Sequence, residues 1–149
     1  MFRQVEITPP WIPPTEEMNP SANRAVSITE SEAIRLKHDY IGAEHLLLGI
    51  LSLDEGIACS SLKSQGMTPD KLRTDAKYQT GSGRKTPRFT PTMMKIIPMG
   101  IAKAKSSGQD LATPENLFEA IIEEGQNIAI LILDSMKVDT GAVQKKIRK

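Results

Sequence analysis

The sequence predicts an all-α fold made of two copies of one four-helix unit. Three observations lead to this prediction. The chain repeats itself at an offset of 71 positions, its helix-start signals recur, and no segment shows sustained alternation of polar and apolar residues. The offset aligns identical residues without a gap: Pro20/Pro91, Ala33/Ala104, Asp39/Asp110, Glu44/Glu115, Leu46/Leu117, Ile50/Ile121, Ala58/Ala129, Leu62/Leu133 and Ser64/Ser135. The repeat is compatible with one compact pseudo-symmetric domain or with two small tandem ones.

The first 18 residues are expected to form a proline-rich arm ahead of the repeats. Proline locks φ and removes a backbone donor, so we expect residues 1–18 to be extended and mostly non-helical. Trp11 and Ile12 could pin this arm onto the core or onto a partner. Because chain termini are usually poorly ordered, a loosely docked tail is favoured.

Copy one is predicted to cover residues 19–78, with helices over about 20–37, 43–53, 56–65 and 69–78. A polar residue followed by proline marks a helix start, because the polar side chain caps free N–H groups and proline fits the first helical position. Four starts in the whole chain have this chemistry: Asn19-Pro20, Thr68-Pro69, Thr90-Pro91 and Thr113-Pro114. Gly66 is expected to close the third helix as a left-handed cap.

A Gly/Ser-rich linker over residues 79–89 is predicted to join the copies. Copy two, residues 90–149, repeats the plan with helices over about 91–107, 114–124, 126–136 and 140–148. Gly108 is expected to cap the first of these helices. Pro98 lies inside the same helix, and the sequence leaves open whether this proline breaks the helix or only bends it.

Composition excludes several classes of protein. A length of 149 residues corresponds to about one domain, and a formal net charge of +1 with 4% aromatic residues argues against a nucleic-acid binder. Cys59 is the single cysteine, which rules out an intrachain disulfide and fits a reducing compartment. No apolar run approaches the roughly 18 residues of a membrane span. Residues 1–17 resemble neither a secretory signal nor a transit peptide.

One motif resembles a known family. Residues 38–51, HDYIGAEHLLLGIL, resemble the Clp N-terminal repeat, the paired four-helix module in front of Clp-type AAA+ unfoldases. The resemblance covers about residues 18–148 and is weaker in copy two, where it runs through Arg88-Phe89-Thr90-Pro91 and residues 111–117. It implies one Clp N-like domain of about eight helices that binds proteins and is not an enzyme. A phosphate loop is missing, because residues 81–86, GSGRKT, have the wrong spacing for one.

The resemblance implies an accessory or adaptor role in Clp-type ATP-dependent proteolysis. The partners would be a Clp ATPase, Clp protease subunits or their protein substrates. The proline-rich arm favours a free-standing Clp N-domain protein; the alternative is the N-terminal docking domain of a Clp AAA+ unfoldase. We expect a monomer without cofactor or metal and without nucleic-acid or membrane partners. The expected location is the bacterial cytoplasm, with the plastid stroma as the alternative.

Four residues are binding candidates by this resemblance: Glu44, Glu115, Thr90 and Asn19. Glu44 and Glu115 begin the second helix of each copy, where a glutamate offsets the helix dipole, and this capping role alone is favoured. In some members of the family, the resemblance implies, this glutamate binds the guanidinium of phosphorylated arginine. Thr90 would help at the second site. Asn19, its counterpart in copy one, departs from the family pattern.

The remaining candidates are better explained as structural residues. His38 lies seven residues from His45 across a turn, so we expect His45 to be a satisfied histidine at a helix contact and not a metal ligand. Cys59 is expected to be a small buried side chain. For Met93, Met94 and Met99, core filling is favoured over an exposed peptide-binding groove. A basic set is expected to be a solvated helix end, or a weak patch for an acidic partner: Lys137, Lys145, Lys146, Arg148 and Lys149.

Overall fold

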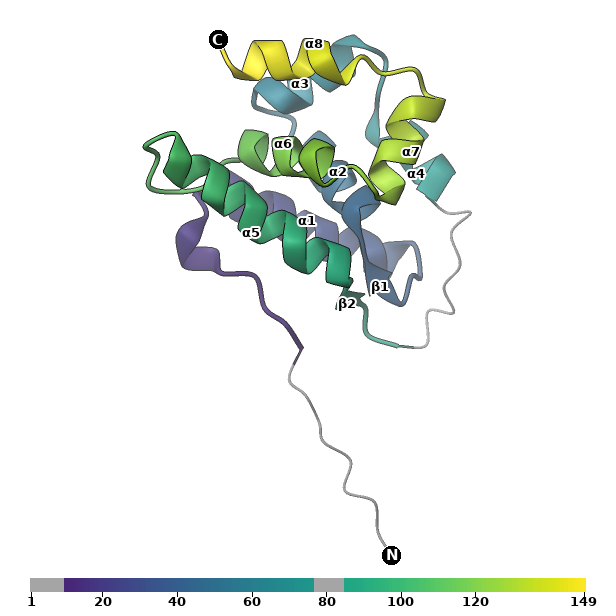
Figure 1. Cartoon of the computed structure of the whole chain (residues 1–149). Helices are drawn as coiled ribbons and strands as arrows, with labels where there is room; N and C mark the ends of the chain where they lie inside the picture. Colours follow the sequence, from purple (N-terminus) through teal and green to yellow (C-terminus); the bar gives the residue numbers. More distant parts are fainter. Residues whose placement is uncertain (1–9, 77–84) are drawn as a thin grey trace, which may run out of the picture.

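The computed structural model describes residues 10–76 and 85–149, and within them it confirms an all-α fold of two four-helix units (Figure 1). Copy one comprises α1 (Pro20–Arg35), β1 (Tyr40–Ile41), α2 (Ala43–Leu51), α3 (Ile57–Ser64) and α4 (Pro69–Ala76). Copy two comprises β2 (Arg88–Phe89), α5 (Pro91–Ser106), α6 (Pro114–Glu124), α7 (Ile128–Ser135) and α8 (Thr140–Ile147). None of the helices in these described ranges is long and apolar enough to cross a membrane.

The predicted helix starts are confirmed at all four positions. Each polar side chain accepts the backbone N–H three residues later: Asn19 from Ala22, Thr68 from Lys71, Thr90 from Met93 and Thr113 from Asn116. Each bond satisfies one of the N–H groups that a helix start leaves without an intrahelical acceptor.

The predicted left-handed caps are also confirmed, with φ of 87° at Gly66 and 78° at Gly108. The offset of 71 maps these two glycines onto Lys137 and Lys37, which have φ of 57° and 60° and close α7 and α1 in the same way. Because Lys37 takes the left-handed conformation, α1 ends at Arg35 and not at residue 37 as predicted. Lysine is not a typical residue for this conformation, so the sequence did not mark that end.

Pro98 does not break its helix, since α5 is continuous from Pro91 to Ser106. The proline ring cannot donate to the carbonyl of Met94, four residues earlier. Both residues are exposed, so water can satisfy that carbonyl.

The two copies exchange equivalent contacts. β1 and β2 pair in parallel, with Ile41 opposite Phe89, and a second parallel bridge joins Met18 to Ala112. The offset of 71 maps Met18 onto Phe89 and Ile41 onto Ala112, so this is one contact made twice, each time between the copies. These reciprocal bridges join the repeats into one compact domain and exclude two tandem ones.

The strand β2 corrects one prediction about the linker. Arg88 and Phe89, assigned to the linker, form β2, and Phe89 is buried. A two-residue strand is too short to show alternation in the sequence. Residues 77–84, with the predicted end of the fourth helix and most of the linker, lie outside the described residues.

The arm is docked where the structure describes it. Residues 1–9 lie outside the described residues, but the Trp11 ring meets the Phe89 ring edge-on with centroids 5.3 Å apart. Thr15–Glu17 forms one 3-10 turn (η1), and Met18 is buried. A loosely docked tail is therefore wrong for residues 10–18, although Ile12 remains 74% exposed.

Candidate functional site

The N-terminal ends of three helices line one cavity of about 280 Å³ at the junction of the two copies. The lining residues come from the starts of α1, α3 and α6 and from the loop before α3: Asn19, Ser21, Leu53, Glu55, Gly56, Pro114 and Glu115. A helix N-terminus carries partial positive charge, whereas Glu55 and Glu115 bring carboxylates. The cavity can therefore attract an anionic group and a cationic group side by side.

Two of the four predicted site residues, Asn19 and Glu115, meet in this cavity, and they come from different copies. The reciprocal bridges cause this, because the Asn19 N–H donates to the Ala112 carbonyl at 2.8 Å and so places the start of α1 beside the start of α6. The Thr90 N–H donates to the Ile41 carbonyl at 3.1 Å and so places α5 beside the start of α2. The predicted pairing of Thr90 with Glu115 within copy two is therefore wrong, because Thr90 lies beside copy one.

Glu115 is half-buried and caps a helix of the other copy. Its Oε2 accepts the Ala58 N–H of α3 at 3.1 Å. The N-cap of α3 is Gly56, which has a φ of 92° and no side chain with which to cap. In copy two the equivalent N-cap is Asn127, whose side chain accepts the N–H of Ile130. The start of α3 is thus capped by Glu115 from the other copy, whereas the start of α7 is capped by its own N-cap residue, Asn127.

Removal of this cap should lower stability. We expect Glu115→Ala to reduce the free energy of unfolding by about 1 kcal/mol, the usual cost of losing a helix cap. Glu115→Gln should lose less, because its amide oxygen can still accept the Ala58 N–H. Urea unfolding measures both variants, and amide exchange at Ala58 should accelerate in the alanine variant only. Equal stability of the two variants would contradict the capping role.

Glu55 lies beside a cation on the rim of the cavity. Its Oε1 accepts the Ser21 hydroxyl at 3.1 Å and lies 3.5 Å from Nη1 of Arg24. The Arg24 Nη2 also donates to the Leu53 carbonyl. Sequence reasoning missed Ser21, Arg24 and Glu55 because they meet only through tertiary packing of α1 against the loop before α3.

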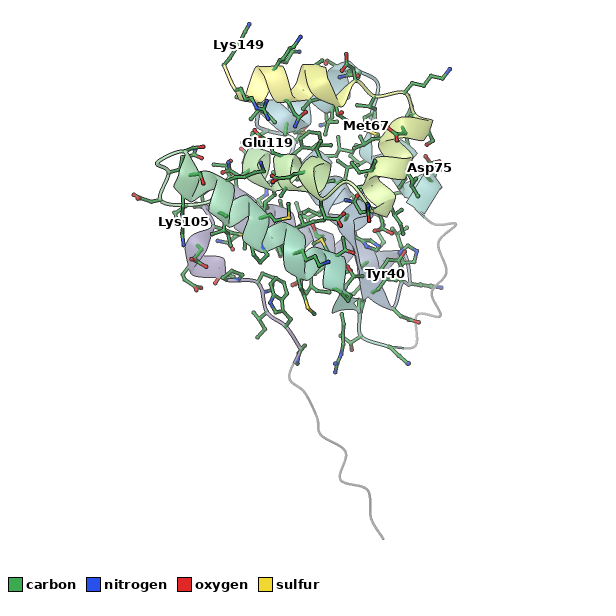
Figure 2. The ribbon with its side chains drawn as sticks, viewed as in Figure 1. Tyr40, Met67, Asp75, Lys105, Glu119 and Lys149 are labelled. Atoms are coloured by element: carbon green, nitrogen blue, oxygen red, sulfur yellow. The ribbon has the colours of Figure 1, made fainter. Side chains whose placement is uncertain are left out.

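Glu44, the counterpart of Glu115, is 1% exposed and accepts the Tyr40 hydroxyl at 2.9 Å. Burial raises the pKa of Glu44, and the hydrogen bond from Tyr40 opposes that rise. Burial, and then the Glu44 charge, raise the pKa of Tyr40 well above its usual value. Figure 2 labels Tyr40, the first residue of β1. The offset maps Tyr40 onto Leu111, which cannot donate a hydrogen bond, so copy two has no such cover over its glutamate.

His45 is satisfied, as predicted, but its partners differ from the prediction. Its Nδ1 accepts the Gly42 N–H at 2.9 Å, and its Nε2 lies 2.7 Å from Nδ1 of His38. The turn therefore brings the two histidines into contact, although their spacing suggested that they were apart. Asn116 takes the same role in copy two, where its Oδ1 accepts the Thr113 N–H. Among the described residues, no group of three potential ligands could hold a metal ion.

Cys59 is buried, as predicted, and its Sγ lies 3.2 Å from the Leu51 carbonyl. Core filling is confirmed for Met93, which is fully buried, while Met99 is half-buried and packs against the core, and Met94 is 38% exposed. The predicted basic set at the C-terminus is exposed throughout. Its role as a patch for an acidic partner stays a prediction.

The sequence matches a known family model and several curated relatives. Residues 17–87 match the family model described as the Clp repeat (R) N-terminal domain. The negative regulator of genetic competence ClpC/MecB of Bacillus subtilis (strain 168) is 28% identical over 129 residues, which cover 85% of this chain and 16% of that protein. The ClpA homolog of Cyanidium caldarium, an ATP-binding subunit of the ATP-dependent Clp protease, is 30% identical over 137 residues, covering 89% and 16%. The chain thus spans about one sixth of the length of these relatives.

Solved structures show the same fold. The N-terminal domain of the chaperone ClpD from Arabidopsis thaliana has a TM-score of 0.73 at 19% identity and covers 88% of this chain and 94% of that one. The Hsp104 N-terminal domain from Candida albicans also has a TM-score of 0.73, at 6% identity, with 88% and 89% covered. A complex of the ClpV N-domain with a VipB peptide has a TM-score of 0.62 at 18% identity, with 89% and 88% covered.

Proposed function

This chain carries a Clp repeat N-terminal domain, and from that premise we propose that it is a non-catalytic protein-binding module of Clp-type ATP-dependent proteolysis. The observation that carries the proposal is the Asn19–Glu115 cavity. There the acidic position of the repeat is half-exposed and lies among three helix N-termini. Of the two equivalent glutamates, Glu115 has a carboxylate that a ligand can reach, whereas Glu44 is covered.

The chemistry of the cavity suits a group that is both cationic and anionic. The carboxylates of Glu115 and Glu55 can bind a guanidinium through charge-assisted hydrogen bonds. The helix N-termini and the nearby Arg24 favour a phosphate. Phosphorylated arginine in a protein substrate combines these two groups, and we assign it to this cavity.

Two contexts would use such a module. In the first the chain is an accessory or adaptor that contacts a Clp ATPase, Clp protease subunits or their substrates. In the second it is the substrate- and adaptor-docking domain of a Clp AAA+ unfoldase. The ClpV N-domain that shares this fold is known in complex with a VipB peptide, which supports protein binding in either context.

A labelled peptide with one phosphoarginine tests the cavity. Fluorescence anisotropy should show binding to the wild type and about tenfold weaker binding to Glu115→Gln, since one charge-assisted hydrogen bond is lost. Glu44→Gln is the matched control, because it removes the covered carboxylate, and its affinity should equal that of the wild type. Equal affinities for the phosphoarginine and unmodified arginine peptides would contradict the assignment.

The Clp context needs a separate test. Tagged wild type should capture Clp ATPase or Clp protease subunits, or their substrates, from a lysate of the native organism, as read by mass spectrometry. Glu115→Gln should lose the substrates and keep any partner that binds elsewhere. If no Clp component is enriched over a tag-only control, the Clp context fails.

A further inference from the structure

A second and larger groove, of about 830 Å³, lies between α5, α6 and the C-terminal end of α8. One wall is a row of acids on α6, Glu115, Glu119 and Glu123, whose spacing of four residues places them on one face of the helix. Met99 of α5 and Ile147 of α8 add apolar surface, and polar side chains, including Lys103 and Arg148, line much of the remainder. Figure 2 shows Glu119 on the side of α6 that faces α8.

The equivalent region of copy one is closed. The offset maps Glu119 onto Leu48, which is 0% exposed. In copy one Arg73 of α4 donates two hydrogen bonds to Glu32 of α1, at 3.1 and 2.8 Å, and so fastens the fourth helix to the first. The corresponding residues in copy two are Gln144 and Lys103, which cannot form an ion pair. The fourth helix of copy two therefore lacks the contact that closes copy one.

Glu119 is poorly compensated inside the protein. Its side chain is only 13% exposed, yet the cation nearest to it, Nη2 of Arg148, lies 3.8 Å away and belongs to a side chain that is 66% exposed. That distance is longer than a hydrogen bond between nitrogen and oxygen. Lys103 pairs with Glu123 and not with Glu119. Because Glu119 lines the groove and no side chain among the described residues is hydrogen-bonded to it, its carboxylate can accept a charge-assisted hydrogen bond from a cation of another molecule.

We propose that this groove docks a short amphipathic helix of a partner protein, one that carries arginine or lysine beside apolar residues. Helix α4 of this chain is an example of such a helix: its Leu72 is completely buried, and the neighbouring Arg73 pairs with the carboxylate of Glu32. The partner helix places its apolar side chains on Met99 and Ile147 and its cation on Glu119, where it displaces Arg148. Three carboxylates against two basic side chains on the groove favour a cationic helix over an acidic one.

The groove and the Asn19–Glu115 cavity share one lining residue, Glu115. The inference depends on the proposed function only in taking a protein as the partner. Variants of Glu119 and Met99 change the groove alone, so the two proposals can fail independently.

Two synthetic peptides test the groove. The first is an alanine-based helix of about 15 residues, long enough to be partly helical, with leucine and arginine repeated on one face. The second has glutamate in place of each arginine. Amide shifts in labelled protein should change around residues 99–106, 115–123 and 147–148 with the arginine peptide, which should bind at least about tenfold more tightly than the glutamate peptide.

Glu119→Gln should lower the affinity for the arginine peptide about tenfold. Met99→Gln should also lower this affinity, because apolar contact is lost. Asp134→Asn, which removes an exposed acid on α7, is the matched control and should leave its affinity unchanged. Any of three results would overturn the proposal: no binding of the arginine peptide, equal affinities for the two peptides, or amide shifts confined to the Asn19–Glu115 cavity. Phosphoarginine binding that survives in Glu119→Gln would show that the cavity works apart from the groove.

Discussion

Gly49→Ala should lower the free energy of unfolding by about 2–3 kcal/mol, the cost of overpacking a close contact. A Cβ on Gly49 would lie 2.4 Å from both the Ala25 carbonyl oxygen and Thr29 Oγ1 on α1. Thr29 cannot simply rotate away without loss, because its hydroxyl is buried and donates to that same carbonyl at 2.7 Å. The alanine therefore forces α1 and α2 apart at the centre of the core.

Copy two shows why the glycine lies there. The offset maps Thr29 and Gly49 onto Gly100 and Ala120, so in each copy one helix of the crossing pair carries a glycine. A Cβ on Gly100 would lie 2.8 Å from Leu117 Cδ2, which is a comparable close approach. The glycine lies on the second helix in copy one and on the first helix in copy two, but the two helices cross closely in both copies.

Urea or thermal unfolding measures the effect, and Gly141→Ala is the matched control. Gly141 is an exposed helical glycine in α8, where a Cβ would lie 3.3 Å from Oδ1 of the exposed Asp139 side chain, so alanine should change stability by no more than about 1 kcal/mol. If Gly49→Ala were as stable as the wild type, the close crossing of α1 and α2 would be wrong.

Acidification should destabilise the domain through His45, by up to about 4–5 kcal/mol between pH 6.5 and pH 3. His45 is fully buried, and burial, followed by the neighbouring His38, lowers its pKa to about 3. In the unfolded chain the ring takes a proton as the pH falls through 6.5, whereas in the folded protein it stays neutral down to about 3. Stability is therefore complete above pH 6.5 and is lost progressively below it.

Glu44 acts in the opposite direction. Its pKa is raised, so the folded state binds a proton more readily than the unfolded chain, and protonation of Glu44 recovers part of the loss in acid. The His45 effect begins near pH 6.5, where the unfolded chain starts to bind the histidine proton. In Glu44→Gln, where the opposing carboxyl group is absent, we expect destabilisation as the pH falls from 7 toward 5.

Urea unfolding at several pH values measures this slope, and His45→Asn provides the control. Asn116 already performs the same capping role in copy two without a titrating ring. The asparagine variant should therefore keep the cap and show a much flatter pH dependence. An NMR titration that placed the pKa of His45 near 6.5 would contradict the expectation.

The features that the sequence predicted are those that depend on nearby residues. The caps at Asn19, Thr90 and Thr113 were readable because each bond joins residues three apart. The end of α5 at Gly108 could be predicted because glycine tolerates the left-handed conformation. The equivalent end of α1 at Lys37 has the same conformation, but lysine gives no such signal in the sequence.

The candidate site was only half predictable. The repeat located Glu44 and Glu115 at equivalent positions, and nothing local distinguished them. The difference comes from Tyr40, four residues before Glu44 across a turn, and from Gly56, which has no side chain, so that the Ala58 N–H of its helix is capped by Glu115, 57 residues away from Ala58. Asn19 and Glu115 share a cavity through a bridge between copies, which no spacing in the sequence reveals.

Fold class, duplication and helix positions could be predicted from the sequence, because periodicity, caps and the repeat depend on residues that are close in the chain or regularly spaced. Tertiary packing was needed to show which acidic helix start is open and which is covered, and that the fourth helix is fastened to the first in copy one but not in copy two. These outcomes depend on side chains that meet across the junction, such as Arg73 with Glu32 and Glu115 with Ala58. Two copies of one pattern can therefore share a backbone and still expose different surfaces.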